Sequence, residues 1–253
     1  MPATIRGRRG GRKGLAALKK QDHALLKAGM AMADHGLKGA LELTGPEACL
    51  AYYRDWAANY DSGFADGMEY LLPAHVAAAF LGSGGAGPVL DVGAGTGLLA
   101  ERLRGMGFNA PIDGVDFSPE MLARAAEKQV YRALVQADIT RPLALPRQYR
   151  GIVSSGTFTA GHVGPEALPN LLGVALPGAQ VALSVNRRVW ASAGFDRVLD
   201  GLSQTGLSQT GLLQTGRIAD LHLIEVEVYG AAAAAVDADH AADRALIALF
   251  RAV

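Results

Sequence analysis

The stretch Val89-Leu90-Asp91-Val92-Gly93-Ala94-Gly95-Thr96-Gly97-Leu98-Leu99 decides the fold of this chain. A short run with the character of a buried strand ends near a carboxylate, three glycines form a turn, and a helix begins. Glycine at alternate positions removes Cβ atoms that block close approach and allows the positive φ angles of a sharp turn. A helix starting near Thr96 directs unpaired N–H groups toward the same place. The pattern predicts a loop that contacts a nucleoside-bearing cofactor.

The spacing of the glycines distinguishes two classes of cofactor. A dinucleotide fingerprint requires its third glycine where this chain has Leu98, whereas Gly93, Gly95 and Gly97 alternate. Asp91, inside the strand end, would repel a pyrophosphate but suits a cationic ammonium or sulfonium group. The loop therefore favours S-adenosylmethionine over NAD, and a nucleotide-cofactor oxidoreductase remains an alternative.

Two further segments repeat the pattern of a strand that ends in an acid. Residues 111–117 predict a second strand ending at Asp116, and residues 131–137 predict a third strand followed by Asp138. In a parallel sheet, these strand ends lie along one edge, which is where open α/β sheets bind ligands. We therefore expect Asp91, Asp116 and Asp138 to face one site.

These segments carry a family resemblance. Residues 89–97 together with 114–121 resemble the class I S-adenosylmethionine-dependent methyltransferases. The segments 52–61 and 156–163 are similar to methyltransferase-like proteins named for the Williams–Beuren region, and the similarity runs from about Asp34 to the C-terminus. Arg150-Gly151 departs from that pattern, because such proteins often carry an acid there. The resemblance implies an α/β fold: a doubly wound, mostly parallel seven-stranded sheet with its last strand antiparallel and an N-terminal helical cap.

The resemblance also implies which residues hold S-adenosylmethionine. The methionine part would lie against Asp91 and the glycine loop, the ribose diol against Asp116, and the adenine against Asp138 and Ile139. The full set expected to contact the cofactor is Tyr60, Asp91, Gly93, Ala94, Gly95, Thr96, Gly97, Asp116, Phe117, Met121, Asp138 and Ile139.

The predicted fourth strand covers residues 152–154. The loop that follows this strand would face the transferred methyl group. Enzymes that methylate exocyclic amines of nucleic-acid bases carry Asn/Asp-Pro-Pro-aromatic at this point, and this chain has Ser154-Ser155-Gly156-Thr157. Cys49 lies in the wrong segment for the thiolate that cytosine C5 chemistry needs, and the six histidines show no metal-ligand spacing. By elimination we expect a small-molecule acceptor that is methylated on O, N or S, and neither a metal nor a nucleic-acid partner.

The same loop supplies candidates for chemistry and for the substrate pocket. His162 is its one acid–base group, and an imidazole can accept a proton from an acceptor near neutral pH. A purely structural role for His162 stays open. Thr157, Phe158 and, from the lead-in segment, Trp56 are expected to line the substrate pocket. A non-catalytic S-adenosylmethionine sensor is the alternative function, because its binding residues would be the same.

Upstream of the glycine loop, the sequence predicts two helices. A capping-box pattern at residues 44–47 starts a helix that runs to about Tyr60. Tyr53, Trp56 and Tyr60 form one aromatic stripe on it, which is either core or a lid over the cofactor, where aromatic faces attract a sulfonium. The second helix is expected over residues 72–81.

Composition and charge bound the class of protein. The 253 residues are 50% hydrophobic and 19% charged, with one cysteine and no apolar run that could span a bilayer, so we expect a cytoplasmic protein without a membrane partner. Residues 1–20 hold seven basic residues and no acidic one. We expect residues 1–29 to be a solvated tail, 30–84 a helical cap and 85–253 the cofactor-binding domain. An RNA-binding arm and an organelle address remain alternatives for the tail.

The C-terminal third completes the predicted sheet. The expected elements are a strand over 180–185 after a turn at Pro177-Gly178, a helix over 193–202, and strands over 221–228 and 244–253. Residues 201–215 contain a five-residue unit three times, GLSQT, GLSQT and GLLQT. A period of five matches neither a helix nor a strand, so we expect an expanded surface connection or an irregular extension of the preceding helix.

Overall fold

The computed structural model describes residues 60–204, 216–238 and 240–253, together with Tyr52, Ala57 and the backbone of residues 206–207 and 213–214. The strands of the main sheet are β1 (Val89–Val92), β2 (Ile112–Asp116), β3 (Ala133–Gln136), β4 (Tyr149–Phe158), β5 (Ala175–Asn186), β8 (Ile218–Glu227) and β9 (Arg244–Ala252). The helices are the π-helix η2 (Tyr60–Ala65), α4 (Leu72–Gly82), α5 (Leu98–Gly105), α6 (Pro119–Glu127), the 3₁₀ turn η3 (Pro165–Ala167), α7 (Leu168–Val174), α8 (Phe195–Ser203) and α9 (Ala233–Val236).

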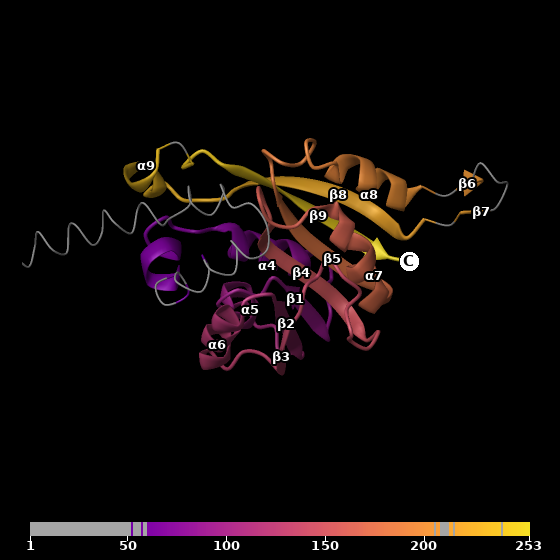
Figure 1. Cartoon of the computed structure of the whole chain (residues 1–253), viewed down its shortest axis with the longest axis horizontal. Coiled ribbons are helices and arrows are strands. Elements are labelled where there is room, and N and C mark those ends of the chain that lie inside the picture. Colours follow the sequence, from indigo (N-terminus) through magenta and orange to yellow (C-terminus); the bar gives the residue numbers. More distant parts are fainter. Residues whose placement is uncertain are drawn as a thin grey trace, which may run out of the picture.

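The sheet has the order β3-β2-β1-β4-β5-β9-β8 (Figure 1). Strands β1 to β5 pair in parallel, and β9 runs antiparallel to both β5 and β8. This confirms the predicted doubly wound seven-stranded sheet with an antiparallel last strand. The chain moves outward from β1 to β3 and then returns to place β4 on the other side of β1. Such a switch point opens a crevice at the carboxyl ends of the strands.

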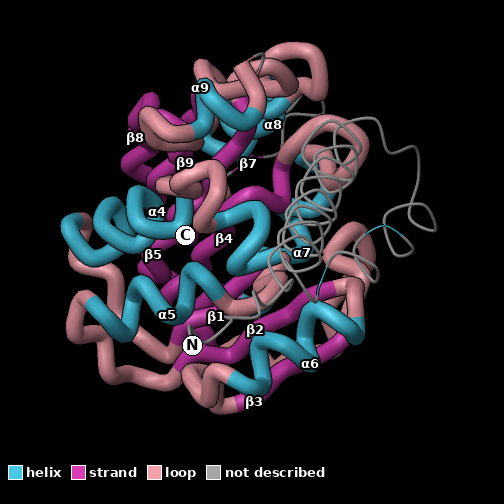
Figure 2. The backbone as a smooth tube through the Cα atoms, turned by 90° about the vertical axis from the view of Figure 1, so that its left-hand side faces the viewer, coloured by secondary structure: helices cyan, strands magenta, loops and turns pink. Residues whose placement is uncertain are grey.

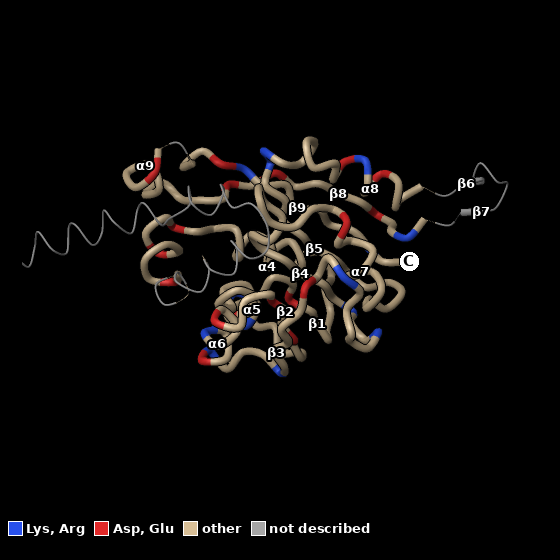
Figure 3. The backbone as a smooth tube through the Cα atoms, in the orientation of Figure 1, with Lys and Arg blue, Asp and Glu red and all other residues tan. Residues whose placement is uncertain are grey.

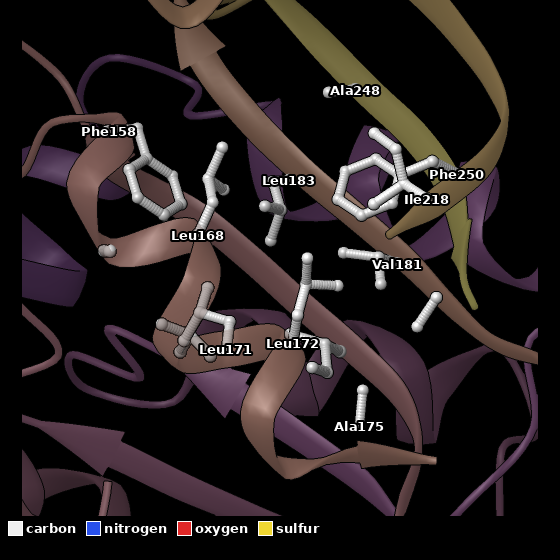
Figure 4. Packing of buried hydrophobic residues seen from close by; sticks show 14 of the residues in the cluster. Phe158, Leu168, Leu171, Leu172, Ala175, Val181, Leu183, Ile218, Ala248 and Phe250 are labelled. Atoms are coloured by element: carbon white, nitrogen blue, oxygen red, sulfur yellow. The ribbon is translucent and has the colours of Figure 1, made fainter. Parts of the chain in front are cut away.

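Helices cover both faces of the sheet, because the central strands are apolar on both sides. On one face, Phe80 of α4 and Leu103 of α5 pack with Val153 of β4, and Figure 2 shows α4, α5 and α6 following one another along this face. On the other face, Leu171 of α7 packs with Ile152, the neighbour of Val153 in β4. Figure 4 shows the α7 side chains lying over this second face. The two cores hold the strand ends rigidly in place.

Helix α4 belongs to the sheet and not to a separate cap. Its Val76, Ala77 and Phe80 are fully buried in the same cluster as Val89 of β1. The division predicted between residues 84 and 85 therefore falls inside one folded unit. The sequence of α4 is apolar on several sides, which suits a helix that packs against the sheet on one side and against α5 on another.

Strand β4 is longer than predicted and carries a bulge. Ser154 pairs with Leu183 and Phe158 pairs with Val185, so β4 uses four steps where β5 uses two. Gly156, at the centre of the bulge, has φ +80°. Residues 155–158 were expected to be loop, but the bulge keeps them within the strand while it displaces Ser155 to Thr157 toward the crevice. Bulges next to active sites commonly re-aim side chains in this way.

Other expectations for the C-terminal third need correction. Pro177-Gly178 lies within β5 as an irregularity and does not form a turn before it, because β5 already pairs with β4 at Ala175. In the repeat, Gly206–Leu207 (β6) pairs antiparallel with Leu213–Gln214 (β7), so this part is no extension of α8. The first repeat residues, 201–203, belong to the end of α8. Residues 205, 208–212 and 215, most of the predicted 44–60 helix including Trp56, and the basic tail lie outside the described residues.

Within the ranges that the structure describes, no helix is both long enough and apolar enough to cross a membrane.

Candidate active site

A cavity of about 550 Å³ lies at the carboxyl ends of β1, β2, β3 and β4. This volume falls in the range of cofactor and small-molecule sites. Its walls come from η2 and α4, from the loops after the four strands, and from the start of α6. They are formed by Tyr60, Tyr70, Pro73, Gly93, Ala94, Gly95, Thr96, Leu98, Leu99, Asp116, Phe117, Ser118, Met121, Ala137, Asp138, Ile139, Thr140, Ser155, Gly156, Thr157, Gly161, His162 and Val163.

The three glycines after β1 have separate physical roles. All have positive φ, +65° at Gly93, +53° at Gly95 and +90° at Gly97. A Cβ on Gly93 would lie 2.0 Å from Oγ1 of Thr157, so glycine there lets the loop pack against β4. A Cβ on Gly95 would meet nothing within 4 Å, so this position opens into the cavity and leaves room for a ligand against the backbone. Gly97 is the N-cap of α5 and packs against Tyr131, outside the cavity wall.

Asp116, at the end of β2, ties the glycine loop to the neighbouring strand. Its Oδ2 accepts a hydrogen bond from the N–H of Gly95 at 2.8 Å, and its Oδ1 accepts one from the N–H of Ser118 at 2.8 Å. Burial raises the pKa of Asp116, and these N–H donors oppose that rise. Asp116 therefore orients the loop while it forms part of the cavity wall.

Asp91 is fully buried beneath the loop and does not form part of the cavity wall. The hydroxyl of Tyr131 donates to its Oδ2 at 2.6 Å, whereas its buried Oδ1 has no hydrogen-bond partner among the described residues. Burial raises the pKa of Asp91 to about 7; the Tyr131 bond lowers it and the negative charge of Asp116 raises it further. A buried carboxylate with an unsatisfied oxygen favours a cation nearby and disfavours a phosphate.

The far end of the cavity, after β2 and β3, combines apolar side chains with a carboxylate. Met121 and Ile139 are buried in the wall, and Phe117 is 36% exposed. Asp138 accepts hydrogen bonds from the N–H of Thr140 at 2.9 Å and from its hydroxyl at 2.6 Å, which closes the turn after β3. This end can hold a flat apolar group that also has polar edges.

The other end of the cavity, after β4, holds the acid–base candidate. Nδ1 of His162 lies 2.8 Å from the carbonyl oxygen of Ala160. With the proton on Nδ1 for that bond, the acceptor lone pair is on Nε2. Burial lowers the pKa of His162 from its ordinary value of 6.5, so the imidazole is neutral at neutral pH. The Thr157 hydroxyl is already used, since it donates to the carbonyl of Val92 at 3.1 Å and accepts from Ser154 at 2.9 Å.

The segment before α4 reaches the glycine loop through Asp61. Oδ1 of Asp61 accepts from the hydroxyl of Thr96 at 2.5 Å, and Oδ2 lies 2.7 Å from Nζ of Lys128. Lys128 also pairs with Glu101 of α5. Tyr60, next to Asp61, forms part of the cavity wall as expected. Asp61 therefore fastens η2 to the loop and to the end of α6.

Phe158 does not line the substrate pocket, contrary to expectation. It is 1% exposed and packs edge-to-face against Phe195 of α8 with ring centroids 5.6 Å apart. Figure 4 shows it beside Leu168 in the core. Phe158 is still part of β4 and follows Ile152 by an even number of residues, so its side chain faces the side of the sheet that α7 and α8 cover.

The cavity also contains Tyr70 and Ser155, which the sequence analysis missed. Tyr70 precedes α4 and Ser155 begins the bulge of β4. Neither belongs to a motif, and only the adjacency of Ser155 to the predicted fourth strand pointed to its position.

Comparisons with known proteins agree with this geometry. Residues 89–177 match the family model of a methyltransferase domain. This segment therefore resembles a methyltransferase domain. Human methyltransferase-like protein 27 is 34% identical to the chain over 142 residues, which are 53% of this chain and 56% of that protein. The chain thus spans about half the length of this curated relative.

Solved structures with a similar fold include two other methyltransferases. A putative S-adenosyl-L-methionine-dependent methyltransferase from Methanococcus maripaludis has a TM-score of 0.49 and 17% identity, covering 78% of this chain and 91% of that one. The N-methyltransferase NodS from Bradyrhizobium japonicum, in complex with S-adenosyl-L-homocysteine, has a TM-score of 0.47 and 16% identity, covering 71% and 85%.

The residues of this methyltransferase domain fit S-adenosylmethionine, the cofactor of the superfamily. The open space above Gly95 would accept a ligand against the backbone, and the unsatisfied Oδ1 of Asp91 suits a cationic group. The family match and the cavity both agree with the superfamily and the cofactor expected from the sequence.

Proposed function

We propose that this protein transfers a methyl group from S-adenosylmethionine to an O, N or S atom of a small-molecule acceptor. One observation carries the proposal. A single cavity joins the glycine loop and the acids after β2 and β3 to the bulged end of β4, where His162 lies. A cofactor at one end and an acceptor at the other would therefore share one enclosed space.

The residues of the chain would act mainly by holding the two reactants in position. When bound, S-adenosylmethionine supplies a methyl group that is activated by its attachment to a positively charged sulfur. Asp116 and Asp138 would hold the nucleoside, and the backbone of the glycine loop would approach the rest of the cofactor. Holding two reactants in attack geometry can contribute ~7–11 kcal/mol to the lowering of the barrier.

His162 would accept the proton that the acceptor atom loses. Its Nδ1 contact with Ala160 orients the ring, and its lowered pKa keeps Nε2 unprotonated at neutral pH. Activity that depends on this group should therefore fall only on the acidic side, at a lower pH than an ordinary imidazole would give.

A small acceptor agrees with the charge distribution. Long basic surfaces are what nucleic-acid partners require. Here, both signs of charge lie side by side on α6 and α8 (Figure 3). Within the described cavity wall, the charged groups are the carboxylates Asp116 and Asp138. Both features favour a small molecule over a polyanion.

The proposal is tested by incubating the protein with S-adenosylmethionine that carries an isotopically heavy methyl group and with a fractionated metabolite extract. We expect S-adenosylhomocysteine and a mass-shifted metabolite to form together, and both to form more slowly with Asp116→Ala at a cofactor concentration that does not saturate the variant. Cofactor binding without turnover in any fraction would indicate a sensor. Binding of NADH without binding of S-adenosylhomocysteine would indicate an oxidoreductase and contradict the proposal.

A further inference from the structure

The hydroxyl groups of the cavity wall differ in how far the protein itself uses them. Four of them donate a hydrogen bond to an oxygen atom elsewhere in the chain. These donors are Thr96, Ser118, Thr140 and Thr157. The hydroxyl oxygen of Ser155, in contrast, is buried and has no hydrogen-bond partner among the described residues. A buried polar group in this state costs free energy, which a ligand recovers by bonding to it.

The bulge of β4 holds the backbone on both sides of Ser155. Before it, the hydroxyl of Ser154 donates to the carbonyl of Val92 at 2.7 Å, which ties the bulge to β1. After it, the N–H of Gly156 donates to the hydroxyl of Ser184 at 3.0 Å, which ties the bulge to β5. The Ser155 hydroxyl is therefore presented from a fixed point of the cavity wall.

Tyr70 brings a second hydroxyl to the same place. It lies within reach of the Ser155 hydroxyl, and a Cβ on Gly156 would lie 2.4 Å from the Tyr70 oxygen. The ring of Tyr70 packs 5.7 Å from that of Phe64 and 5.8 Å from that of Tyr229. A phenol that is packed in this way has little freedom to turn, so its hydroxyl keeps one position beside Ser155.

Both groups are hydrogen-bond donors at neutral pH. Burial raises the pKa of Tyr70 to about 12, against a smaller opposing effect of the Ser155 hydroxyl, so the phenol keeps its proton. Two adjacent donors match a carboxylate, which has two oxygen atoms that accept and none that donate. Hydrogen bonds to a carboxylate are charge-assisted and therefore stronger than those to an uncharged oxygen.

The charges in the cavity favour a carboxylate at this end. S-adenosylmethionine brings a positive sulfonium into the cavity, and a carboxylate carries the opposite charge. The carboxylates of the wall itself, Asp116 and Asp138, follow β2 and β3. In the order β3-β2-β1-β4, the residues after β4 lie at the other end of the cavity from those after β3. A carboxylate beside Tyr70 and Ser155 therefore meets less repulsion than it would elsewhere in the cavity.

We infer that Tyr70 and Ser155 form a carboxylate-binding site, in which each hydroxyl donates one hydrogen bond to the ligand. The carboxylate belongs either to the amino-acid end of S-adenosylmethionine or to a methyl acceptor that carries such a group. This inference rests on the proposed function, because both are ligands of that reaction.

The first arm of the test compares S-adenosylhomocysteine with decarboxylated S-adenosylhomocysteine, which lacks only the carboxylate. Calorimetry measures the affinity of the wild type, Tyr70→Phe and Ser155→Ala for both compounds. If the site holds the cofactor carboxylate, each substitution should weaken S-adenosylhomocysteine about tenfold to a hundredfold, the effect of one lost bond to a charged group. The affinity for the decarboxylated compound should stay the same, which also shows that the variants fold.

The second arm measures benzoate binding by ligand-observed NMR. The protein is saturated with sinefungin, which carries an amine where S-adenosylmethionine carries the methylated sulfur. If the site holds an acceptor carboxylate, benzoate should bind the wild type more tightly than benzyl alcohol does. Tyr70→Phe and Ser155→Ala should then each weaken benzoate about tenfold to a hundredfold and leave the affinity for S-adenosylhomocysteine unchanged.

Tyr229→Phe and Ser192→Ala are the matched controls. Tyr229 belongs to the aromatic cluster around Phe64 but not to the cavity wall, and Ser192 is exposed in the segment after β5. Both variants should bind S-adenosylhomocysteine and benzoate as the wild type does.

The inference is overturned if neither arm responds, with S-adenosylhomocysteine bound equally by all variants and benzoate either unbound or unaffected. An equal loss of affinity for S-adenosylhomocysteine and its decarboxylated form would overturn it as well, because the effect would not involve the carboxylate. If S-adenosylhomocysteine failed to bind the wild-type protein, the proposed function would fail instead.

Discussion

The hydroxyl of Tyr131 donates a hydrogen bond of 2.6 Å to Oδ2 of Asp91, a residue 40 positions earlier in the chain. The bond satisfies one oxygen of a carboxylate that is completely buried, and it leaves the other oxygen without a partner among the described residues. A carboxyl group in this state is poised between its two protonation states near neutral pH, because its pKa is about 7. Both the binding of a cation and the stability of the fold should therefore respond to pH.

We expect the affinity for S-adenosylmethionine to rise between pH 6 and pH 8. A cationic ligand favours the ionised form of Asp91, so binding should release a proton near pH 7. Calorimetry in two buffers with different ionisation enthalpies measures that proton. Asp91→Asn should bind more weakly at pH 8 and lose most of the pH dependence. An affinity independent of pH in the wild type would show that Asp91 does not sense the ligand charge.

The ligand-free protein should lose stability over the same interval. The folded pKa of Asp91, about 7, lies above its ordinary value of 3.8, so the folded state holds the proton more tightly than the unfolded state. The stability linked to this proton is fully present below pH 3.8 and is lost as the pH rises through 7. Urea unfolding at pH 6 and pH 8 should show a smaller decrease for Asp91→Asn than for the wild type.

Asp116→Ala should weaken the binding of S-adenosylhomocysteine by roughly tenfold to several hundredfold. A carboxylate that accepts from ribose hydroxyls makes charge-assisted bonds worth ~1.5–3 kcal/mol each, and these are not additive. The substitution also releases the N–H of Gly95, which Asp116 holds in the loop. Asp196→Asn, an exposed carboxylate on α8, is the control and should bind normally. An unchanged dissociation constant for Asp116→Ala would leave Asp116 with a structural role only.

Asp61 should couple η2 to cofactor binding. If the segment closes over the cofactor, hydrogen exchange over residues 60–66 should slow on addition of S-adenosylhomocysteine, and more than in the strands. Asp61→Asn should reduce this protection and weaken binding by about twofold to fivefold, because its ion pair with Lys128 is partly exposed. Asp66→Asn, in the same segment but exposed, is the control. Equal protection with and without ligand would show that η2 stays closed over the cavity whether or not the cofactor is bound.

Phe158→Ala should cost stability and leave the binding of S-adenosylhomocysteine unchanged. Truncation of a buried phenylalanine typically lowers the free energy of unfolding by ~3–5 kcal/mol. Phe158→Leu should cost less, since it leaves a smaller cavity against Phe195. Denaturant unfolding and calorimetry measure the two quantities separately. A large loss of affinity at near-wild-type stability would contradict this prediction and would show that Phe158 contributes to the binding pocket.

Much of the sheet and most of the cofactor end of the cavity could be predicted from local sequence. Gly93 to Gly97 follow a short apolar run, and a turn that needs positive φ at alternate positions accepts little besides glycine. Asp116 and Asp138 could be placed together because parallel strands present their carboxyl ends at one edge. Tyr60, Met121 and Ile139 were predicted from the resemblance, and they line the cavity as well.

Tertiary contacts decided which side chains line the β4 end of the cavity and how Asp91 is hydrogen-bonded. Ser155 to Thr157 reach the cavity because a bulge interrupts the pairing of β4 with β5, and the partner strand determines where that bulge forms. The sequence by itself therefore determined the glycine loop, because that loop depends on local backbone preferences, and the resemblance carried by residues 89–97 and 114–121 implied the doubly wound fold. Only the tertiary structure decided that Tyr131 reaches Asp91, that Asp61 holds Thr96 and that Tyr70 fills the space at Gly156. Each of these contacts joins residues distant in the chain, so no local pattern encodes it.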